Sequence, residues 1–396
     1  MAQGFLLDGQ WISEGDPFVV RSPYDGKVVG STFRPRPAHL ERAVRVAVRA
    51  FEITRKLPSY ARAEVLRKVA EGIGKDREEF ARIIALEAGK PIRTARAEVE
   101  RAVFTFSVAA EEATRIGGEY LPLDLQASTA GRWGLVRRFP VGPILSITPF
   151  NFPLNLVAHK LAPAIAAGCT VVHKPHPQTP LSSLKLTQAV ERAAWPPGAL
   201  NVLPLGGSDA EPLVADDRLK MVSFTGSAAV GWELRKKAGK KRVTLELGGN
   251  AGVIIHHDAD IEIAAERCTL GGFAYAGQSC IAVQRILVHK TIYDRFLAAF
   301  LPRVAKLKLG DPLDEATDVG PMIREADAIR ASGWIEEAVH GGAQVLLGGH
   351  RRGALMEPTV LSRTRTEMKV NCLEIFAPVV TVEPYDEFAD ALQRVN

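Results

Sequence analysis

Apolar positions in the first third of the chain recur at the spacing of amphipathic helices. Leu40, Val44, Ala47 and Phe51 lie three or four residues apart, so they share one face of a helix. Three further helices are expected to begin at a polar cap or at a proline, namely at Ser59, Asp76 and Pro91. The last of these helices is expected to run to about Gly117.

From residue 143 onward, short apolar runs alternate with helical patterns. The runs predict strands at residues 144–147, 170–173, 200–203, 221–224 and 243–245. Thr179 and Pro180 have the residue types of a helix cap and a first helical residue. A second segment of alternating strands and helices starts after Gly249. Strands joined by helices form parallel sheets, so the pattern predicts an α/β fold with ligands at the carboxyl ends of its strands.

Two stretches fall outside this scheme. Residues 1–35 contain short strand-like runs that turns interrupt. Residues 120–140 alternate apolar and polar side chains around Arg132 to Arg138, which is typical of an exposed strand. We therefore expect an arm or bridging hairpin in this second stretch.

The composition excludes several classes of protein. Of the 396 residues, 46% are hydrophobic and 24% are charged, as in a soluble globular protein. No apolar run is long enough to cross a bilayer, and the first residues lack the pattern of a secretory signal. The formal net charge is +5, and the 50 lysines and arginines are spread along the chain. We expect neither a membrane nor a nucleic acid as partner.

The cysteines indicate a reducing compartment. Cys169, Cys268, Cys280 and Cys372 lie far apart and form no C-x-x-C pair, so neither a disulfide framework nor a zinc site is expected. The run from His256 to Asp258 follows an apolar strand and is interpreted as a polar turn, not as a set of metal ligands. The sequence therefore predicts a cytoplasmic protein without a bound metal.

One cysteine has a setting that favours chemistry. Cys280 closes the run Gly277 to Cys280, which follows an approach rich in alanine and glycine. Small residues let a ligand come close to the backbone, although a lone cysteine is often a small buried apolar side chain. Glu246 and Asn151 also lie in turns marked by glycine or proline. Together they supply a nucleophile, a base and a donor for an oxyanion.

Two other segments suggest a dinucleotide. The run Phe224 to Ser227 joins a strand to a helix, and a helix N-terminus can hold a pyrophosphate. Lys174 ends a strand, from which it can donate hydrogen bonds to ribose hydroxyls. A plain helix start and a surface lysine explain the same residues. The chain has no G-x-G-x-x-G motif.

In their order along the chain, six segments resemble the aldehyde dehydrogenase superfamily. They are the turn around Asn151, Lys174-Pro175, and the runs 224–227, 245–249, 277–280 and 374–379. The resemblance implies a dinucleotide-binding domain with a parallel sheet, a second α/β catalytic domain and a small bridging arm. The implied boundaries are residues 1–120 and 141–247 for the first domain, 121–140 for the arm and 248–396 for the catalytic domain.

The resemblance also implies roles for single residues. Cys280 would attack an aldehyde, Asn151 would hold the oxyanion of the thiohemiacetal, and Glu246 would activate the water that hydrolyses a thioester. NAD or NADP would be the acceptor. The implied cofactor-binding residues are Thr148, Phe150, Lys174, His176, Gly226, Ser227, Leu247, Glu374 and Phe376.

Departures from the family pattern leave alternatives open. His176-Pro177 stands where members that prefer NAD often carry an acidic residue, so use of NADP is plausible. A relative that transfers the acyl group to coenzyme A is a second interpretation, which Glu246 disfavours. A catalytically silent dinucleotide-binding or structural fragment is a third, because family members continue beyond the point that corresponds to Asn396. We expect a truncated chain whose full-length form is a homodimer or homotetramer.

The substrate expected from the resemblance is a small aldehyde. Members that act on hydroxy- or phospho-aldehydes such as lactaldehyde look most similar. The helix that carries Arg101, Phe104 and Phe106 is expected to wall the pocket. Arg101 suits an anionic aldehyde, but a surface arginine on a helix is the simpler interpretation.

Overall fold

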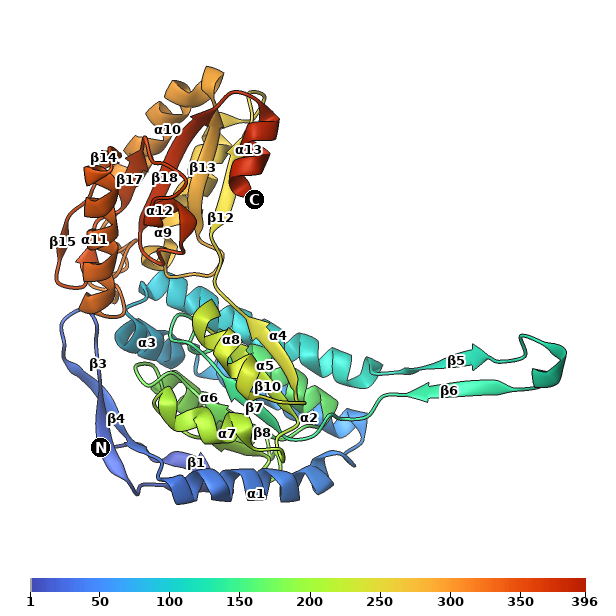
Figure 1. Cartoon of the computed structure of the whole chain (residues 1–396). Helices are drawn as coiled ribbons and strands as arrows, with labels where there is room; N and C mark the ends of the chain where they lie inside the picture. Colours follow the sequence, from blue (N-terminus) through green and yellow to red (C-terminus); the bar gives the residue numbers. More distant parts are fainter. Residues whose placement is uncertain (1) are drawn as a thin grey trace.

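The computed structural model describes residues 2–396. It contains two five-stranded sheets, each with helices against it, and a long two-stranded arm that projects to one side (Figure 1). The first sheet has the order β11-β10-β7-β8-β9, and all its strand pairs are parallel. Its strands are β7 (Ile144–Ile147), β8 (Val171–Lys174), β9 (Leu200–Val202), β10 (Met221–Thr225) and β11 (Arg242–Glu246). The predicted α/β fold is confirmed.

Eight helices belong to this first unit. They are α1 (Pro37–Thr54), α2 (Ser59–Lys75), α3 (Arg77–Ala88), α4 (Ile92–Arg115), α5 (Asn155–Ala167), α6 (Leu181–Arg192), α7 (Glu211–Ala215) and α8 (Ala228–Lys237). α4 packs against α2, α3 and α5, so it joins the N-terminal helices to the sheet layer. One continuous apolar core spans the unit, from Phe5 in the first strand to Ala238 after α8.

The second sheet has the order β12-β13-β18-β17-β14. Its strands are β12 (Ala251–Ile255), β13 (Val283–His289), β14 (Gln344–Leu347), β17 (Thr359–Ser362) and β18 (Val379–Tyr385). Only β14 runs antiparallel to its neighbour. The helices of this unit are α9 (Ile261–Phe273), α10 (Tyr293–Ala305), α11 (Glu325–His340), α12 (Lys369–Cys372) and α13 (Phe388–Val395). A separate apolar core runs from Ile255 to Val382.

The remaining strands form small hairpins. β1 (Phe5–Leu7) pairs with β2 (Gln10–Ile12), and β3 (Asp16–Arg21) pairs with β4 (Val28–Arg34). A short pair, β15 (Arg351–Arg352) and β16 (Leu355–Met356), borders the second unit. No helix among residues 2–396 has the length and apolar character that a bilayer crossing requires.

The stretch predicted as an arm is a hairpin of β5 (Gly118–Pro122) and β6 (Trp133–Arg137). It extends α4 away from both units, and in Figure 1 it contacts neither of them beyond its root. Large apolar side chains on it are exposed, with Leu135 70% and Trp133 61% accessible. The two cores lie within the predicted boundaries 1–120 with 141–247 and 248–396, whereas the hairpin begins at Gly118, before the predicted start of the arm at residue 121. The division into domains at those residues stays a prediction.

Three local predictions were wrong. Ser59 is the first residue of α2, and the cap position is Pro58. Asp76 does not cap α3 with its side chain, because its carboxylate forms ion pairs with Lys185 and Arg192. Neither Thr179 nor Pro180 caps α6 with a side chain. Instead, the buried Glu87 carboxylate accepts hydrogen bonds from the backbone N–H groups of Leu181 and Ser182 at 2.8 and 2.9 Å. A long-range contact of this kind leaves no local trace in the sequence.

Candidate active site

Four parallel strands deliver most of the predicted residues to one edge of the first sheet. β7 leads to Thr148, Phe150 and Asn151, and β8 ends at Lys174 just before His176. β10 leads to Gly226 and Ser227, and β11 ends at Glu246 next to Leu247. Since the strands are parallel, their carboxyl ends lie at the same edge, where ligands of open α/β sheets bind.

Cys280 comes from the second unit, on an irregular loop between α9 and β13. Three consecutive residues in this loop, Tyr275, Ala276 and Gly277, have positive φ angles of 50°, 53° and 65°. Such angles cost about 1–3 kcal/mol for each residue that is not glycine, so the surrounding contacts must impose them. A Cβ atom on Gly277 would lie 2.1 Å from the carbonyl oxygen of Ala377. The loop is therefore packed too closely for any other residue at that position.

The Cys280 side chain is exposed, whereas Cys169 and Cys268 are buried. Partial burial raises the pKa of its thiol, and the carboxylates of Glu374 and Glu246 raise this pKa further. The Arg101 guanidinium acts in the opposite direction. Glu246, Glu374 and Arg101 thus all act electrostatically on one thiol, although the three residues come from three separate elements.

Asn151 links the two units at the same point. Its side-chain Nδ2 donates a hydrogen bond of 3.0 Å to the backbone carbonyl of Gln278, two residues before Cys280. The Asn151 side chain is 4% exposed, and its Oδ1 atom has no hydrogen-bond partner among the described residues. An amide nitrogen has two N–H donors. One of them is engaged by Gln278, which leaves the other for a ligand.

Glu246 is exposed at the end of β11, near a buried cation that the sequence did not point out. Burial lowers the pKa of Lys160 to about 8, and Glu246 opposes this effect. The Lys160 Nζ donates to the Ser223 hydroxyl at 3.0 Å. The sequence signal that could have identified Lys160 is a charged residue among the mostly apolar residues of α5.

From the sequence we assigned no role to His159 and favoured a surface position for Arg101. Burial lowers the pKa of His159, Arg101 and Lys160 lower it further, and Glu246 raises it. The Arg101 guanidinium carbon lies 5.8 Å from the ring centroid of Phe152. Arg101 and Glu246 thus both act electrostatically on Cys280 and on His159. In contrast, Phe106 was wrongly placed in the pocket wall, because its side chain is fully buried in the core.

Glu374 and Phe376 approach from the second unit. The Glu374 Oε1 atom accepts a hydrogen bond of 3.1 Å from the backbone N–H of Gly249. A Cβ atom on Gly248 would lie 1.8 Å from a Glu374 carboxylate oxygen, so any other residue there would displace this carboxylate. The Phe376 ring lies edge-on to Phe150, 6.0 Å between centroids. Residues of both units therefore meet around one opening.

The strand ends fit a dinucleotide. The side chain of Ser227 makes no capping hydrogen bond to α8, so the N-terminal N–H groups of this helix keep their capacity to bind a phosphate. A Cβ atom on Gly226 would lie 2.6 Å from the Phe224 ring. Glycine at this position therefore lets the backbone pass close to that ring just before α8 begins. Lys174 is nearly buried, and burial lowers its pKa to about 8.

The side chain of His176 brings no negative charge to these strand ends. Burial lowers the pKa of His176 to about 3, which leaves the ring neutral at physiological pH. Its Nδ1 atom accepts a hydrogen bond of 3.2 Å from the Gln178 backbone, and its ring lies 5.4 Å from that of Phe150. A neutral ring does not repel a phosphate on the adenosine ribose.

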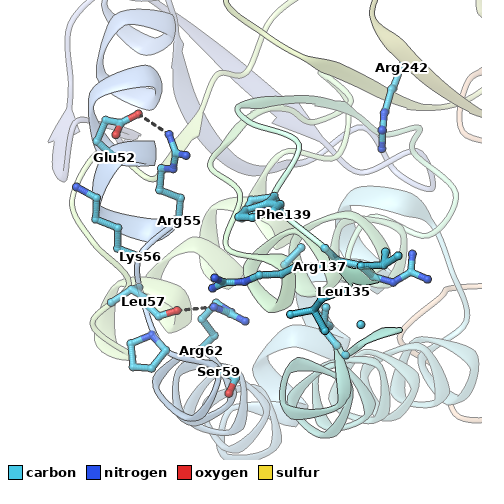
Figure 2. Close-up of a pocket in the computed structure, with 18 residues that line it drawn as sticks. Glu52, Arg55, Lys56, Leu57, Ser59, Arg62, Leu135, Arg137, Phe139 and Arg242 are labelled. Carbon is cyan, nitrogen blue, oxygen red and sulfur yellow. Dashed lines mark hydrogen bonds and ion pairs between the residues drawn. The ribbon is translucent and has the colours of Figure 1, made fainter. Parts of the chain in front are cut away.

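A large cavity lies elsewhere. It has a volume of about 1260 Å³ and lies at the root of the arm, between the α1–α2 corner and β6 (Figure 2). Its charged lining residues are mostly cations, among them Arg55, Lys56, Arg62, Arg137 and Arg242. None of the predicted site residues lines it. A smaller hollow beside Cys280 is lined by Gly249, Ser279, Glu374 and Phe376.

Comparison with known proteins identifies the family. Residues 11–396 match the model of the aldehyde dehydrogenase family. The chain belongs to this family. The resemblance expected from the six segments is thereby confirmed, and so is the predicted fold class.

Three relatives illustrate the similarity. The 3-sulfolactaldehyde dehydrogenase of Priestia megaterium is 42% identical over 99% of this chain and 82% of its own length. The crystal structure of aldehyde dehydrogenase 21 from Physcomitrella patens in complex with the reaction product succinate has a TM-score of 0.97 and 41% identity, over 99% of this chain and 82% of that one. Glyceraldehyde-3-phosphate dehydrogenase of Methanocaldococcus jannaschii, complexed with NADP, has a TM-score of 0.93 and 38% identity, over 97% and 84% of the two chains.

The family sets the reaction class. This aldehyde dehydrogenase is an oxidoreductase that oxidises an aldehyde with NAD or NADP as the acceptor, as predicted.

Proposed function

We propose that this aldehyde dehydrogenase converts a short aldehyde to the free carboxylic acid through a thioester on Cys280. The observation that supports this most is the meeting of an exposed thiol, a half-engaged amide and a carboxylate from separate elements. Nucleophile, oxyanion donor and base are the groups that acyl chemistry on a cysteine requires.

The first step is attack of the Cys280 sulfur on the aldehyde carbon. Since its pKa is raised, the thiol must lose its proton as the S–C bond forms, and this proton passes to solvent water, to which the Cys280 side chain is exposed. The second N–H of Asn151 and the backbone N–H of Cys280 then bind the oxyanion of the thiohemiacetal. A donor of this kind contributes a factor of about 10²–10³ in rate.

A bound dinucleotide would supply the hydride acceptor, and loss of a hydride from the thiohemiacetal carbon would leave the thioester. Lys174 and Ser227 would hold the adenosine ribose and the pyrophosphate, with Thr148, Phe150, His176, Gly226 and Leu247 lining the same cleft. Glu374 and Phe376 would position the nicotinamide ribose and ring. Glu374 is held by the Gly249 N–H and Phe376 by the Phe150 ring, so both are oriented before the cofactor arrives.

Glu246 then takes a proton from water, whose oxygen attacks the thioester carbon. The S–C bond breaks, Cys280 recovers its proton and the carboxylic acid leaves. General-base assistance contributes a factor of about 10²–10⁴. An exposed carboxylate at this position supports transfer to water, whereas transfer to coenzyme A needs no such base.

For the substrate we propose a short aldehyde with an anionic or hydroxylated tail. The support is Arg101, whose charge acts on both Cys280 and His159, so that a cation faces the thiol from α4. The relatives agree with this choice, since one acts on 3-sulfolactaldehyde and another is bound to succinate. Arg101 is exposed on α4, as a surface arginine would be, and the proposal adds a substrate contact at that position.

The test is reduction of NAD or NADP with 3-sulfolactaldehyde, succinate semialdehyde, lactaldehyde and neutral propanal. We expect the anionic aldehydes to have the highest kcat/KM, and Arg101→Gln to lower only those values, by about tenfold. Arg267→Gln, an exposed arginine on α9, is the matched control. Equal kcat/KM values for propanal and the anionic aldehydes, unchanged in Arg101→Gln, would exclude the proposed substrate class.

We further propose that the protein acts in the cytoplasm as a homodimer or homotetramer. The support for association is the arm, because a two-stranded hairpin with exposed Tyr120, Trp133 and Leu135 is an unpaired edge that another chain can cover. Light scattering after size exclusion checks this proposal. A monomer at micromolar concentration would contradict it.

A further inference from the structure

A fully buried ion pair lies behind the two loops that meet at Cys280. Lys90 and Glu98 are 0% and 1% exposed, and the Lys90 Nζ donates to the Glu98 Oε2. Lys90 follows the left-handed Gly89 that ends α3, and Glu98 lies in the second turn of α4. Buried ion pairs are weak evidence for stability, because desolvation of both charges offsets their attraction. The pair therefore calls for another explanation.

Glu98 holds the loop that carries Asn151. Its second carboxylate oxygen, Oε1, accepts hydrogen bonds from the backbone N–H groups of Leu154 and Asn155 at 3.0 and 3.1 Å. These are the first N–H groups of α5, which has no side-chain cap of its own. Because Asn151 precedes Asn155, the first residue of α5, by only four residues, Glu98 fixes the position of the segment that carries the Asn151 amide.

Lys90 touches both loops. Its Nζ lies 3.7 Å from the ring centroid of Phe152, the residue after Asn151, and 4.6 Å from that of Tyr275. Tyr275 is the first left-handed residue of the approach to Cys280, and its hydroxyl donates to the carbonyl of Ala88 at 2.7 Å. A buried ammonium between two aromatic faces attracts both of them. One cation thus joins the Asn151 loop to the Cys280 loop.

We propose that Lys90 and Glu98 are positioning residues, which set the separation between the Asn151 amide and the Cys280 sulfur. Neither residue touches the substrate. The pair acts through Phe152, Tyr275 and the start of α5, and a displacement of about 1 Å at a reacting centre can lower a rate about a hundredfold. This inference rests on the proposed role of Asn151 as the oxyanion donor.

The main test is Lys90→Met, which keeps the length of the side chain and removes the charge. We expect kcat to fall about 10- to 100-fold, with the KM of the aldehyde changed by less than about threefold, because ground-state binding does not need the oxyanion contact. Lys185→Met is the matched control. Lys185 is also nearly buried, pairs with Asp76 and Glu79 and lies 5.4 Å from the Phe80 ring, but it is remote from both loops. Its kcat should stay within about twofold of the wild type.

A double variant separates positioning from stability. In Lys90→Met/Glu98→Gln both buried charges are gone, and the amide oxygen introduced at position 98 can still accept hydrogen bonds from the start of α5. Thermal unfolding should return toward the wild-type midpoint, while kcat stays low. This variant also serves if Lys90→Met alone does not fold.

A double-mutant cycle with Asn151→Ala tests whether Lys90 acts through the Asn151 amide. If Lys90 acts through the amide, Lys90→Met lowers kcat by less than about twofold in the Asn151→Ala background. A full additional loss there would show that the pair does not act through Asn151. Folded Lys90→Met with wild-type kcat would overturn the proposal altogether.

Cys280→Ala in the same assay distinguishes failure of the proposed function from failure of the positioning role of Lys90. If it is as active as the wild type, the proposed function fails, whatever Lys90 does. If it is inactive while Lys90→Met retains full turnover, only the positioning role fails.

Discussion

The two edges that meet at Cys280 are built in different ways. On the first sheet, four parallel strands end together and carry Lys174 and Glu246 as last residues, with Asn151 and Ser227 in the turns that follow β7 and β10. On the second unit, Cys280 follows three left-handed residues that only close packing can hold. The carboxyl edge of the first sheet, the regular edge, follows from strand register. The loop that leads to Cys280, the irregular edge, depends on a few close contacts between single atoms.

The regular edge also relies on buried charge. Glu87 supplies the N-terminal acceptor for α6, and Glu98 supplies it for α5. Ordinary helix caps come from the residue just before the helix. Here the preceding residues belong to turns that are proposed to bind ligands, and carboxylates from α3 and α4 accept the hydrogen bonds of the first N–H groups. This division leaves the turn residues available to bind ligands.

The largest effect is expected at the regular edge. Glu246→Gln should lower steady-state turnover about 10²- to 10⁴-fold, because no base activates the water. One equivalent of reduced nicotinamide per active site should still form in a rapid burst, which stopped-flow absorbance measures. Loss of the burst together with turnover would mean that Glu246 is needed before the thioester forms.

The irregular edge should respond to a single methyl group. Gly277→Ala places a Cβ atom 2.1 Å from the Ala377 carbonyl and must displace the loop. We expect kcat to fall about a hundredfold. Gly26→Ala is the control, since Gly26 has a similar φ of 71° and no atom within 4 Å of its added Cβ. An equal loss of activity in both variants would contradict the account of the loop.

The buried cap of α6 should make stability depend on pH. Burial raises the pKa of Glu87 from 4.5 to about 7. The folded protein therefore holds this proton more tightly than the unfolded chain does. The resulting stabilisation is complete below pH 4.5 and is lost as the pH rises through 7. The difference between the two pKa values corresponds to about 3 kcal/mol.

Thermal unfolding between pH 4.5 and 8 measures this effect. Glu87→Gln should flatten the pH dependence, while Glu71→Gln, at an exposed position on α2, should leave it as in the wild type. Identical curves for the wild type and Glu87→Gln would show that Glu87 does not titrate with folding.

The smallest effect concerns the choice of cofactor. A neutral His176 in place of a carboxylate should let the enzyme use both dinucleotides, with kcat/KM values within about a hundredfold of each other. Parallel kinetics with NAD and NADP provide the measurement. An efficiency with NADP that is hundreds of times lower would show that another group rejects the 2′-phosphate.

The sequence predicted the regular edge better than the irregular one. Strands such as β7 and β10 have local apolar runs, and motifs mark the turns that hold Asn151 and Ser227. The left-handed Tyr275 and Ala276 carry no such mark, since neither residue is typical of that conformation. Contacts between distant segments, such as Glu98 with α5 or Arg101 with the thiol, depend on the packing of α4 and leave no local pattern.

The central claim is that Cys280 forms the thioester at the point where both edges meet. Mass spectrometry of Glu246→Gln, quenched after mixing with NADP and 3-sulfolactaldehyde, tests it most directly. We predict an added acyl mass on the peptide that contains Cys280, absent from Cys280→Ala. Reduced nicotinamide formed by Glu246→Gln without any acyl group on Cys280 would contradict the account.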